Sequence, residues 1–354
     1  MAYTAAPKRI TVGVDTHLDL HVAHANDQLG RRVDAVSIPT TPTGYQDLLA
    51  WARGLGEVDA WGVEGTGSYG AALARFLAAN GQVVLEVNRP DRAARRRHGK
   101  SDPLDAAAAA KAVQAGQVTV TPKAGTGQVE MIRVLRVARQ TAIRARTQAL
   151  NAIKALLVTA PVQLREQLRD LPATTLIAAA AALAPGKITS PLAAAMLALR
   201  TLAHRHQALS DEIKTLTTEL DRLTATAAPR LLALFGAGQD SAGALLVAAG
   251  DNPDRLSSDA CFSMLCGASP IQASSGKTIR HRLNRGGDRQ ANAALYRIVL
   301  VRLRYHQPTK DYVIRRLAQG KSKKEIIRCL KRYIAREVFA ALQPLRHDLL
   351  NPTT

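Results

Sequence analysis

The sequence predicts an α/β region at the N-terminus and an all-α remainder, and three observations support this fold class. Through residue 120, stretches with β-branched or alternating apolar residues are interleaved with helical stretches. From residue 128 onward, apolar side chains recur at helical spacing. The chain has 354 residues, which is enough for two or three domains of roughly 150 residues each. We therefore expect three domains, at residues 1–120, 121–227 and 228–354.

The first region alternates strands and helices in a recognisable order. Short links between the first three strands predict an antiparallel meander. A helix, a strand, a second helix, a strand and an alanine-rich helix follow. This is the element order of the ribonuclease-H-like fold, a mixed sheet with helices on both faces. The predicted strands are residues 10–17, 19–26, 31–38, 58–63 and 82–87, and the predicted helices are residues 43–54, 69–80 and 102–115.

The middle region is predicted to be helical. Residues 128–158 carry apolar side chains on one side, and Ser190 followed by Pro191 is typical of an N-cap and a first helical residue. Further on, apolar residues spaced four and three apart form a coiled-coil seam, which packs within its own domain or joins two chains. The seam favours a homodimer or tetramer. Its residues are Leu209, Ile213, Leu216, Leu220 and Leu223.

The C-terminal region, from residue 229, is predicted to be a second globular unit that is helical at its ends. A Gly/Ser/Pro-rich loop covers residues 267–287. The three cysteines, Cys261, Cys266 and Cys329, are too few for a disulfide framework and lack the partners of a structural zinc site. We predict that all three are small buried hydrophobic residues.

Charge is the strongest signal in the composition. The 48 Lys and Arg residues outnumber the 28 Asp and Glu residues, which gives a net charge of +20 and indicates a polyanionic partner such as nucleic acid. Aromatic residues make up only 4% of the chain, so charge rather than base stacking must carry the affinity. The sequence contains neither a signal-peptide core nor an apolar run long enough to span a membrane. We therefore expect a cytoplasmic protein without a membrane partner.

Four carboxylates of the first region lie where strands end or a helix begins. Asp15 ends the first predicted strand, and Glu64 ends the fourth. Asp102 and Asp105 are one turn apart at the start of the last helix. Each residue alone is compatible with an ordinary cap or turn. Together they predict a catalytic cluster, because adjacent strands end at one edge of a sheet and a crossing helix can add its own carboxylates there.

Clustered carboxylates repel one another unless cations neutralise them. Oxygen ligands suit Mg²⁺, and Mn²⁺ can replace it. Two such ions stabilise the attacking and leaving oxygens of a phosphodiester displacement. The four acidic residues therefore predict a magnesium-dependent reaction on nucleic acid.

A glycine-rich turn follows Glu64. Gly65, Gly67 and Gly70 match the G-x-G-x-x-G pattern between a strand and a helix, and Glu86 ends the next strand, as in a dinucleotide-binding fingerprint. The carboxylate of Glu64 would then lie near a pyrophosphate, and the preceding meander is wrong for that fold. We interpret the glycines as a tight turn that presents Glu64.

The loop of the C-terminal region brings hydroxyls close in sequence to many cations. Ser274 and Ser275 precede Lys277, and residues 277–332 hold 17 Lys and Arg against 3 Asp and Glu. A serine hydroxyl can attack a phosphate while guanidinium groups stabilise the charge that develops. We expect this stretch to bind nucleic acid. The residues expected to do so are Lys277, Arg280, Arg282, Arg285 and Arg289.

Four ordered motifs are spread over nearly the whole chain. They are Val-Asp-Thr-His, Glu-Gly-Thr-Gly-Ser-Tyr, Lys-Ser-Asp-Pro-Leu-Asp-Ala, and Ser-Ser-Gly-Lys with Asn-Arg-Gly-Gly-Asp-Arg-Gln-Ala-Asn. Together they resemble the DEDD-type insertion-sequence transposases of the insertion sequence 110 family. One stretch, residues 235–241, follows the helix-hairpin pattern of that family only loosely.

The resemblance implies a RuvC-like N-terminal domain, a coiled-coil middle and a C-terminal transposase domain with a catalytic serine. It implies a prokaryotic, nucleoid-associated recombinase that cuts and rejoins donor and target DNA through a serine-linked intermediate. A structured bridge RNA from its own element would guide the reaction. By this match the DEDD tetrad is Asp15, Glu64, Asp102 and Asp105, and the serine is Ser275, with Ser274 as the alternative in the adjacent register.

Two competing functions follow from the same residues. A RuvC-like nuclease of the junction-resolvase type would use water as the nucleophile, and the serine loop would only bind. A non-catalytic basic protein would bind nucleic acid in a salt-sensitive way without cleaving it. The sequence favours an enzyme, because all four acidic positions of the family pattern are filled.

Overall fold

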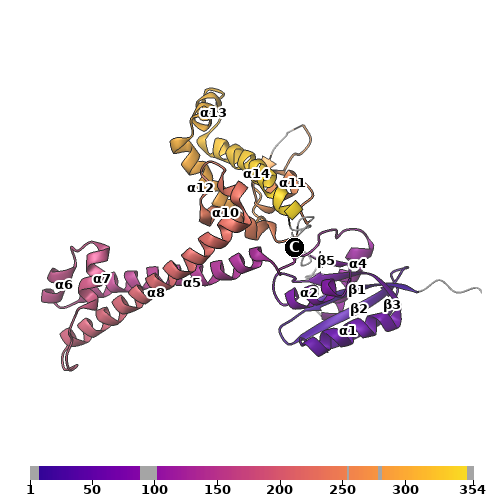
Figure 1. The fold of residues 1–354 in the computed structure, drawn as a ribbon, viewed down its shortest axis with the longest axis horizontal. Coiled ribbons are helices and arrows are strands. Elements are labelled where there is room, and N and C mark those ends of the chain that lie inside the picture. The colour runs from indigo at the N-terminus through magenta and orange to yellow at the C-terminus, as the bar shows by residue number, and fades with distance from the viewer. Residues whose placement is uncertain (1–7, 88–101, 253–254, 278–280, 349–354) are drawn as a thin grey trace, which may run out of the picture. The chain divides into compact units, whose positions relative to one another are not determined.

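The structure, a computed structural model, describes residues 8–87, 102–252, 255–277 and 281–348. The chain forms two compact units, whose elements Figure 1 labels. The first unit comprises Met1–Gly127, Ala249–Ser257 and Arg346–Thr354, and the second comprises Gln128–Ala248 and Ser258–Leu345. Packing alone defines these units, so the division into three domains at residues 120 and 227 stays a prediction.

The first unit contains a five-stranded mixed sheet in the order β3-β2-β1-β4-β5. The first three strands form an antiparallel meander, and β4 and β5 run parallel to β1. Every predicted strand and helix of this region is present, with its ends within two residues of the prediction. The arrangement is compatible with the ribonuclease-H-like fold. The strands are β1 (Arg9–Thr16), β2 (Leu20–Asp27), β3 (Arg32–Pro39), β4 (Glu57–Glu64) and β5 (Val84–Val87).

Helices cover both faces of this sheet (Figure 1). On one face, α1 (Pro42–Leu55) and α2 (Ala71–Ala79) bury a core with alternate residues of the strands, such as Val12 and Val14 of β1. On the other face, α4 (Asp102–Gln114) packs across β1, β2 and β4. Gly13, which lies between Val12 and Val14 in β1, therefore faces α4.

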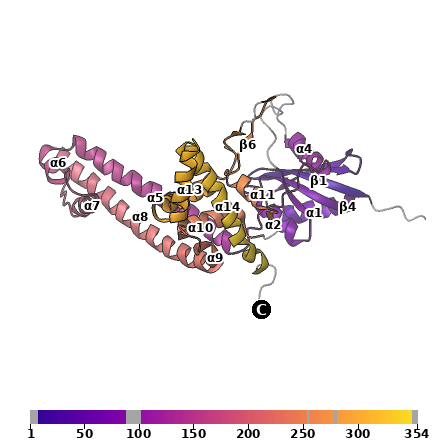
Figure 2. The ribbon, with the colours of Figure 1, turned by 90° about the horizontal axis from the view of Figure 1, so that it is seen from above.

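The second unit begins with two long helices, α5 (Gln128–Thr159) and α8 (Pro191–Ala227), which pack along each other. The short helices α6 (Val162–Leu168) and α7 (Ala173–Ala181) lie against one end of this pair, where they share a core with it (Figure 2). As predicted, α8 begins at Pro191, and the side chain of Ser190 accepts a hydrogen bond from the backbone N–H of Ala193.

Three of the five residues of the predicted heptad seam on α8 are buried within a single chain, and Leu209 and Leu216 are half-buried. Ile213, Leu220 and Leu223 are all less than 10% exposed, with α5 packed against α8. Arg139 of α5 also donates a hydrogen bond to Thr217 of α8 at 2.8 Å. The alternative in which the seam packs inside its own domain therefore explains its apolar residues. The homodimer or tetramer stays a prediction.

Six further helices described by the structure and one small β-ladder complete the second unit. Phe262 and Phe339 contact each other in its core, with ring centroids 6.3 Å apart. The predicted loop at residues 267–287 contains a two-residue antiparallel ladder that sequence analysis did not predict. The elements are α9 (Pro229–Leu232), α10 (Gln239–Ala249), α11 (Asp259–Leu265), β6 (Ile271–Gln272), β7 (His281–Arg282), α12 (Arg289–Tyr305), α13 (Gln307–Ala318) and α14 (Lys323–Asp348).

The prediction that all three cysteines are buried is wrong for two of them. Cys266 is buried, but Cys329 is only half-buried and Cys261 is exposed. The reason for Cys261 is its place in the first turn of α11, where its backbone N–H is capped by Ser258 and its side chain faces outward. Among the described helices, none has both the length and the apolar content needed to cross a bilayer.

Candidate active site

Three acidic side chains converge at one edge of the five-stranded sheet. Asp15 lies in β1, Glu64 is the last residue of the neighbouring parallel strand β4, and Asp105 lies in the first turn of α4. One carboxylate oxygen from each residue lies within 4.8 Å of the other two. Asp15 and Glu64 are only 6% and 4% exposed. Asp102 begins α4, but its side chain lies outside the described residues.

Two glycines allow α4 to lie directly on the sheet. Gly13 of β1 and Gly62 of β4 are register partners. A Cβ at Gly13 would lie 2.1 Å from the carbonyl oxygen of Ala106, and one at Gly62 would lie 2.7 Å from a methyl of Val113. Any larger residue would push α4, and Asp105 with it, away from the strands. Sequence analysis missed this signal, which is a glycine two residues before each strand carboxylate.

The turn after Glu64 fixes the backbone at the end of β4. Gly65 adopts a left-handed conformation with φ 66°, which favours glycine. Gly70 packs so closely that a Cβ there would lie 2.7 Å from the carbonyl oxygen of Glu64. The hydroxyl of Thr16 donates a hydrogen bond to the same oxygen at 2.8 Å. These contacts support the interpretation of the glycine pattern as a tight turn that presents Glu64.

The dinucleotide-binding alternative finds no support in this geometry. The sheet is not doubly wound, because β2 runs antiparallel to both of its neighbours, β1 and β3. Glu86, which would bind a ribose in that fold, instead pairs with Arg255 at 3.4 Å. The meander that argued against the alternative in the sequence is present in the structure.

A histidine next to the acidic cluster was not singled out from the sequence. The Nε2 atom of His17 lies 3.2 Å from Oδ2 of Asp15, and the His17 side chain is 41% exposed. Its signal was present in the Val-Asp-Thr-His motif, two positions after Asp15. His17 therefore brings a partly exposed imidazole next to the cluster.

The donor set of the cluster fits a hard divalent cation. Carboxylate oxygens are the preferred ligands of Mg²⁺ and Mn²⁺, and softer nitrogen or sulfur ligands are not among the three clustered residues. Three ionised carboxylates at this separation repel one another, and a divalent cation relieves that repulsion. Asp15, Glu64 and Asp105 are therefore the described residues that would hold such an ion.

In the second unit, the predicted nucleophile lies on the loop between β6 and β7. Both Ser275 and the neighbouring Ser274 are exposed. The two strands of this hairpin have only two residues each, so they hold the loop weakly by themselves.

Hydrogen bonds at its base hold the hairpin in place. The side-chain amides of Asn284 and Asn292 donate to backbone carbonyls of residues 264–267 at 2.9–3.1 Å. The backbone N–H of Asp288 donates to the carbonyl of Leu265 at 2.6 Å. Lys331 of α14 donates in turn to Asn292 at 2.9 Å. The Asn-Arg-Gly-Gly-Asp-Arg-Gln-Ala-Asn motif therefore acts as a clamp on the serine hairpin.

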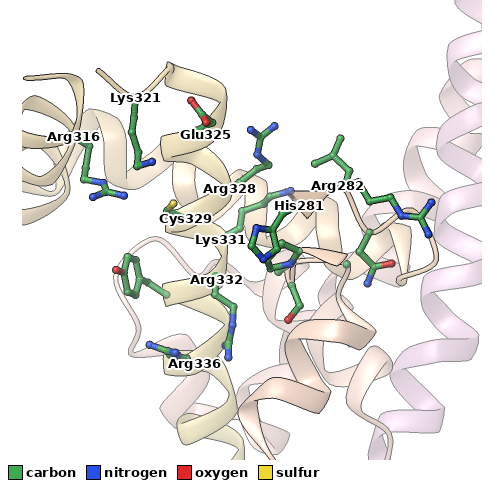
Figure 3. A pocket seen from close by; sticks show the side chains of 17 residues that line it. His281, Arg282, Arg316, Lys321, Glu325, Arg328, Cys329, Lys331, Arg332 and Arg336 are labelled. Carbon is green, nitrogen blue, oxygen red and sulfur yellow. The ribbon is translucent and has the colours of Figure 1, made fainter. Parts of the chain in front are cut away.

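A basic cavity of about 910 Å³ lies beside this hairpin, between β7 and the helices α13 and α14 (Figure 3). Of the five predicted nucleic-acid-binding residues, Arg282 lines it. Lys277, Arg285 and Arg289 are exposed outside its lining, and Arg280 lies outside the described residues. The cationic residues of the lining are Arg282, Arg316, Lys321, Arg328, Lys331, Arg332 and Arg336.

Sequence analysis missed the contribution of α14 to this cavity. Arg328, Arg332 and Arg336 are four residues apart and therefore share one helix face. The spacing can be read from the sequence, but the count of charged residues over 277–332 does not show that these arginines share one face of a helix.

The stretch that follows the family pattern loosely serves as a packing centre. Asp240, at the start of α10, pairs with Arg136, Arg139 and Arg297 at 2.8–2.9 Å. Burial alone would raise the pKa of Asp240, but the three neighbouring guanidinium groups outweigh it and lower the pKa. Asp240 therefore ties α10 to α5 and α12.

Comparison with protein families assigns the chain. Residues 12–160 match the family model for DEDD transposases of the IS110 type, described as a transposase. Residues 228–313 match a second model, described as a transposase of the IS116/IS110/IS902 family. The first match contains all four predicted acidic residues, and the second contains the serine hairpin. No curated protein matches the chain.

The first family model covers the sheet edge with the clustered carboxylates, and the second covers part of the basic helical region. Together they define a transposase. The chain belongs to the IS110 family of DEDD transposases. Membership implies DNA as the substrate and the use of a divalent metal, which agrees with the acidic cluster.

Proposed function

We propose that this transposase moves an insertion sequence by cutting and rejoining donor and target DNA through a covalent serine intermediate. The observation that carries the proposal is the convergence of Asp15, Glu64 and Asp105 within 4.8 Å. Such a cluster suits phosphodiester chemistry. A structured bridge RNA selects the DNA sites in this proposal, in keeping with the family resemblance and the net charge of +20.

In the proposed reaction, the hydroxyl of Ser275 attacks a DNA phosphorus atom. The new bond joins the serine oxygen to phosphorus, the bond to one sugar oxygen breaks, the hydroxyl proton passes to solvent, and the leaving sugar oxygen takes up a proton from solvent. One strand end then carries a phosphoserine ester, and the other carries a free hydroxyl. Because the ester keeps the energy of the phosphodiester, attack by a DNA hydroxyl rejoins the strand without ATP.

The acidic residues and the serine have different roles in this scheme. Asp15, Glu64 and Asp105 hold the divalent cation, with Asp102 as the fourth predicted ligand. When bound there, Mg²⁺, or Mn²⁺ in its place, would supply positive charge for activating the hydroxyl and stabilising the leaving oxygen. The serine and the carboxylates belong to different units, and in this scheme both act on the bound DNA.

The exposed basic residues of the hairpin region bind the DNA backbone in this proposal. Lys277, Arg282, Arg285 and Arg289 are exposed and carry the charge for such contacts. Phosphate contacts position a nucleic acid without reading its sequence, which leaves the choice of site to the RNA.

A suicide DNA substrate that cannot be rejoined tests the proposal. The wild-type protein is expected to form a protein–DNA adduct that survives SDS, because a phosphoserine ester is covalent. Ser275→Ala abolishes the adduct, and Ser274→Ala is the matched control that keeps it. If Ser274→Ala abolishes the adduct and Ser275→Ala keeps it, Ser274 is the nucleophile and the proposed mechanism is otherwise unchanged. Cleavage without an adduct would indicate attack by water and a metal-dependent nuclease.

A further inference from the structure

The basic cavity of the second unit carries charge that the protein itself does not neutralise. Within the described parts of the chain, Arg282, Lys321 and Arg328 have no acidic partner at ion-pair distance, whereas Arg332 and Arg336 pair with Asp259. These cationic residues of the lining come from β7 and from the segments around α13 and α14, and Figure 3 labels each of them.

The one acidic residue of the lining is already engaged. Glu325 accepts hydrogen bonds from the backbone N–H and the hydroxyl of Ser322 at 2.9 Å and 2.7 Å, which is a capping arrangement at the start of α14. Burial, and next the charge of Arg328, lower the pKa of Lys331. Because its lining holds seven cationic side chains and one carboxylate, the cavity is a region of positive potential that favours an anionic ligand.

The shape of the cavity limits the kind of polyanion that it accepts. A volume of about 910 Å³ corresponds to a cube with an edge of roughly 10 Å, within the usual range of ligand pockets. A B-DNA duplex is wider than its own major groove, which is about 12 Å across, so a duplex meets only the rim of a cavity of this size. A single strand fits, and Arg328 and Arg332 follow each other at about 6 Å along the helix axis.

We propose that this cavity binds an unpaired strand of DNA through its sugar–phosphate backbone, without regard to base sequence. Ser269, Pro270 and Arg282 of its lining flank the hairpin that carries Ser275, so a strand in the cavity continues toward the proposed nucleophile. The choice of DNA over RNA rests on the proposed function, in which this serine attacks DNA. The positive potential and the size of the cavity are independent of that function.

Equilibrium binding to the full-length protein, in EDTA so that no cleavage occurs, tests this inference. The probe is a fluorescent oligothymidylate of about 12 nucleotides, compared with a duplex of the same length. The double variant Arg282→Gln/Arg328→Gln removes two exposed cations of the lining. Its matched control, Lys323→Gln/Lys324→Gln, removes two exposed cations of α14 that do not line the cavity.

The cavity variant is expected to bind oligothymidylate about tenfold more weakly and to lose about 1.4 from the log–log salt slope, since each lost contact removes about 0.7. The affinity of the control variant for oligothymidylate stays within about twofold of the wild-type affinity. The affinity for the duplex falls by the same amount in the cavity variant and in the control variant, or by less in the cavity variant. Equal losses in both variants, or equal losses for duplex and single strand, would overturn the inference. Tighter binding of oligouridylate than oligothymidylate would overturn the assignment to DNA.

Two measurements keep these outcomes interpretable. Thermal unfolding followed by circular dichroism shows whether the double variant is folded, and Lys321→Gln replaces it if it is not. The serine-adduct experiment is separate, because it needs metal and chemistry. A missing adduct with intact single-strand binding therefore contradicts the proposed function and not the cavity.

Discussion

The acidic cluster and the serine hairpin are built in opposite ways. Asp15 and Glu64 extend from buried strands of the central sheet and are themselves buried, whereas Ser275 is exposed on a loop between two-residue strands. Core packing positions the carboxylates, and a set of side-chain hydrogen bonds positions the serine. The difference indicates that the cluster exists before substrate binds, while the position of the serine depends on the clamp at the base of its hairpin.

The largest expected effect is the loss of cleavage when a residue of the acidic cluster is replaced. Asp15→Asn or Glu64→Gln removes one ligand of a cation that stabilises charge in the transition state, which costs several kcal/mol and lowers the cleavage rate on the order of 10³-fold. Binding of DNA is expected to stay nearly unchanged. Single-turnover cleavage with Mg²⁺ measures the rate, and Asp19→Asn, an exposed acid just beyond β1, is the control. Cleavage at the wild-type rate in either variant contradicts a catalytic role for the cluster.

A second variant tests whether packing positions the cluster. Gly13→Ala places a methyl group 2.1 Å from the Ala106 carbonyl oxygen, so α4 must shift. We expect a loss of about 1–3 kcal/mol in the free energy of unfolding, the usual cost of overpacking, together with slower cleavage.

The control for this variant is Gly54→Ala in α1, where no atom lies within 4 Å of the added methyl group. It is expected to raise the free energy of unfolding by about 0.4–1 kcal/mol, because alanine restricts the unfolded chain. Chemical denaturation measures both. If the two alanine variants behave alike, α4 is free to move and packing does not fix Asp105.

A variant of the clamp tests the hairpin side of the comparison. Asn292→Ala removes the hydrogen bonds to the carbonyls of Cys266 and Gly267 and leaves Lys331 without its acceptor, at an expected cost of about 1–3 kcal/mol. Amide hydrogen exchange is expected to quicken in residues 264–288, and the yield of serine adduct falls. Gln290→Ala, an exposed neighbour, leaves both unchanged. Unaltered exchange in Asn292→Ala would falsify the clamp.

The smallest expected effect is a pH dependence of stability in the sheet. Burial lowers the pKa of His24, and this outweighs the opposing hydrogen bond with Asn26. Below about pH 6.5 the unfolded chain therefore takes up a proton that the folded chain does not, so the free energy of unfolding falls as the pH decreases.

Denaturation at a series of pH values measures the slope of the free energy of unfolding against pH. His24→Gln is expected to flatten it between pH 7 and the lowered pKa of His24. An unchanged slope in His24→Gln would show that the buried histidine is not its source.

Most of the first unit could be predicted from the sequence, because its strands carry β-branched or alternating apolar residues and short links join the first three of them. The ladder β6–β7 could not, since two-residue exposed strands leave no periodicity to detect. The same contrast holds for the site. Asp15, Glu64 and Asp105 could be predicted from their positions at element ends, and the structure brings them together.

The supporting residues were harder to predict. The role of Gly13 and Gly62 depends on the register between β1 and β4, which the sequence does not state. The basic cavity depends on how the face of α14 with Arg328 and Arg332 packs beside the hairpin. Cys261 was misjudged because hydrophobicity alone does not show which face of a short helix is exposed.

The central claim is that three carboxylates from β1, β4 and α4 form one divalent metal site. Titration of the metal-free protein with Mn²⁺, followed by electron paramagnetic resonance, tests it directly, because free and protein-bound Mn²⁺ give different signals. The account predicts saturable binding in the wild type and in Asp19→Asn, and its loss in Glu64→Gln and in Asp105→Asn. Equal binding by all four proteins would contradict it.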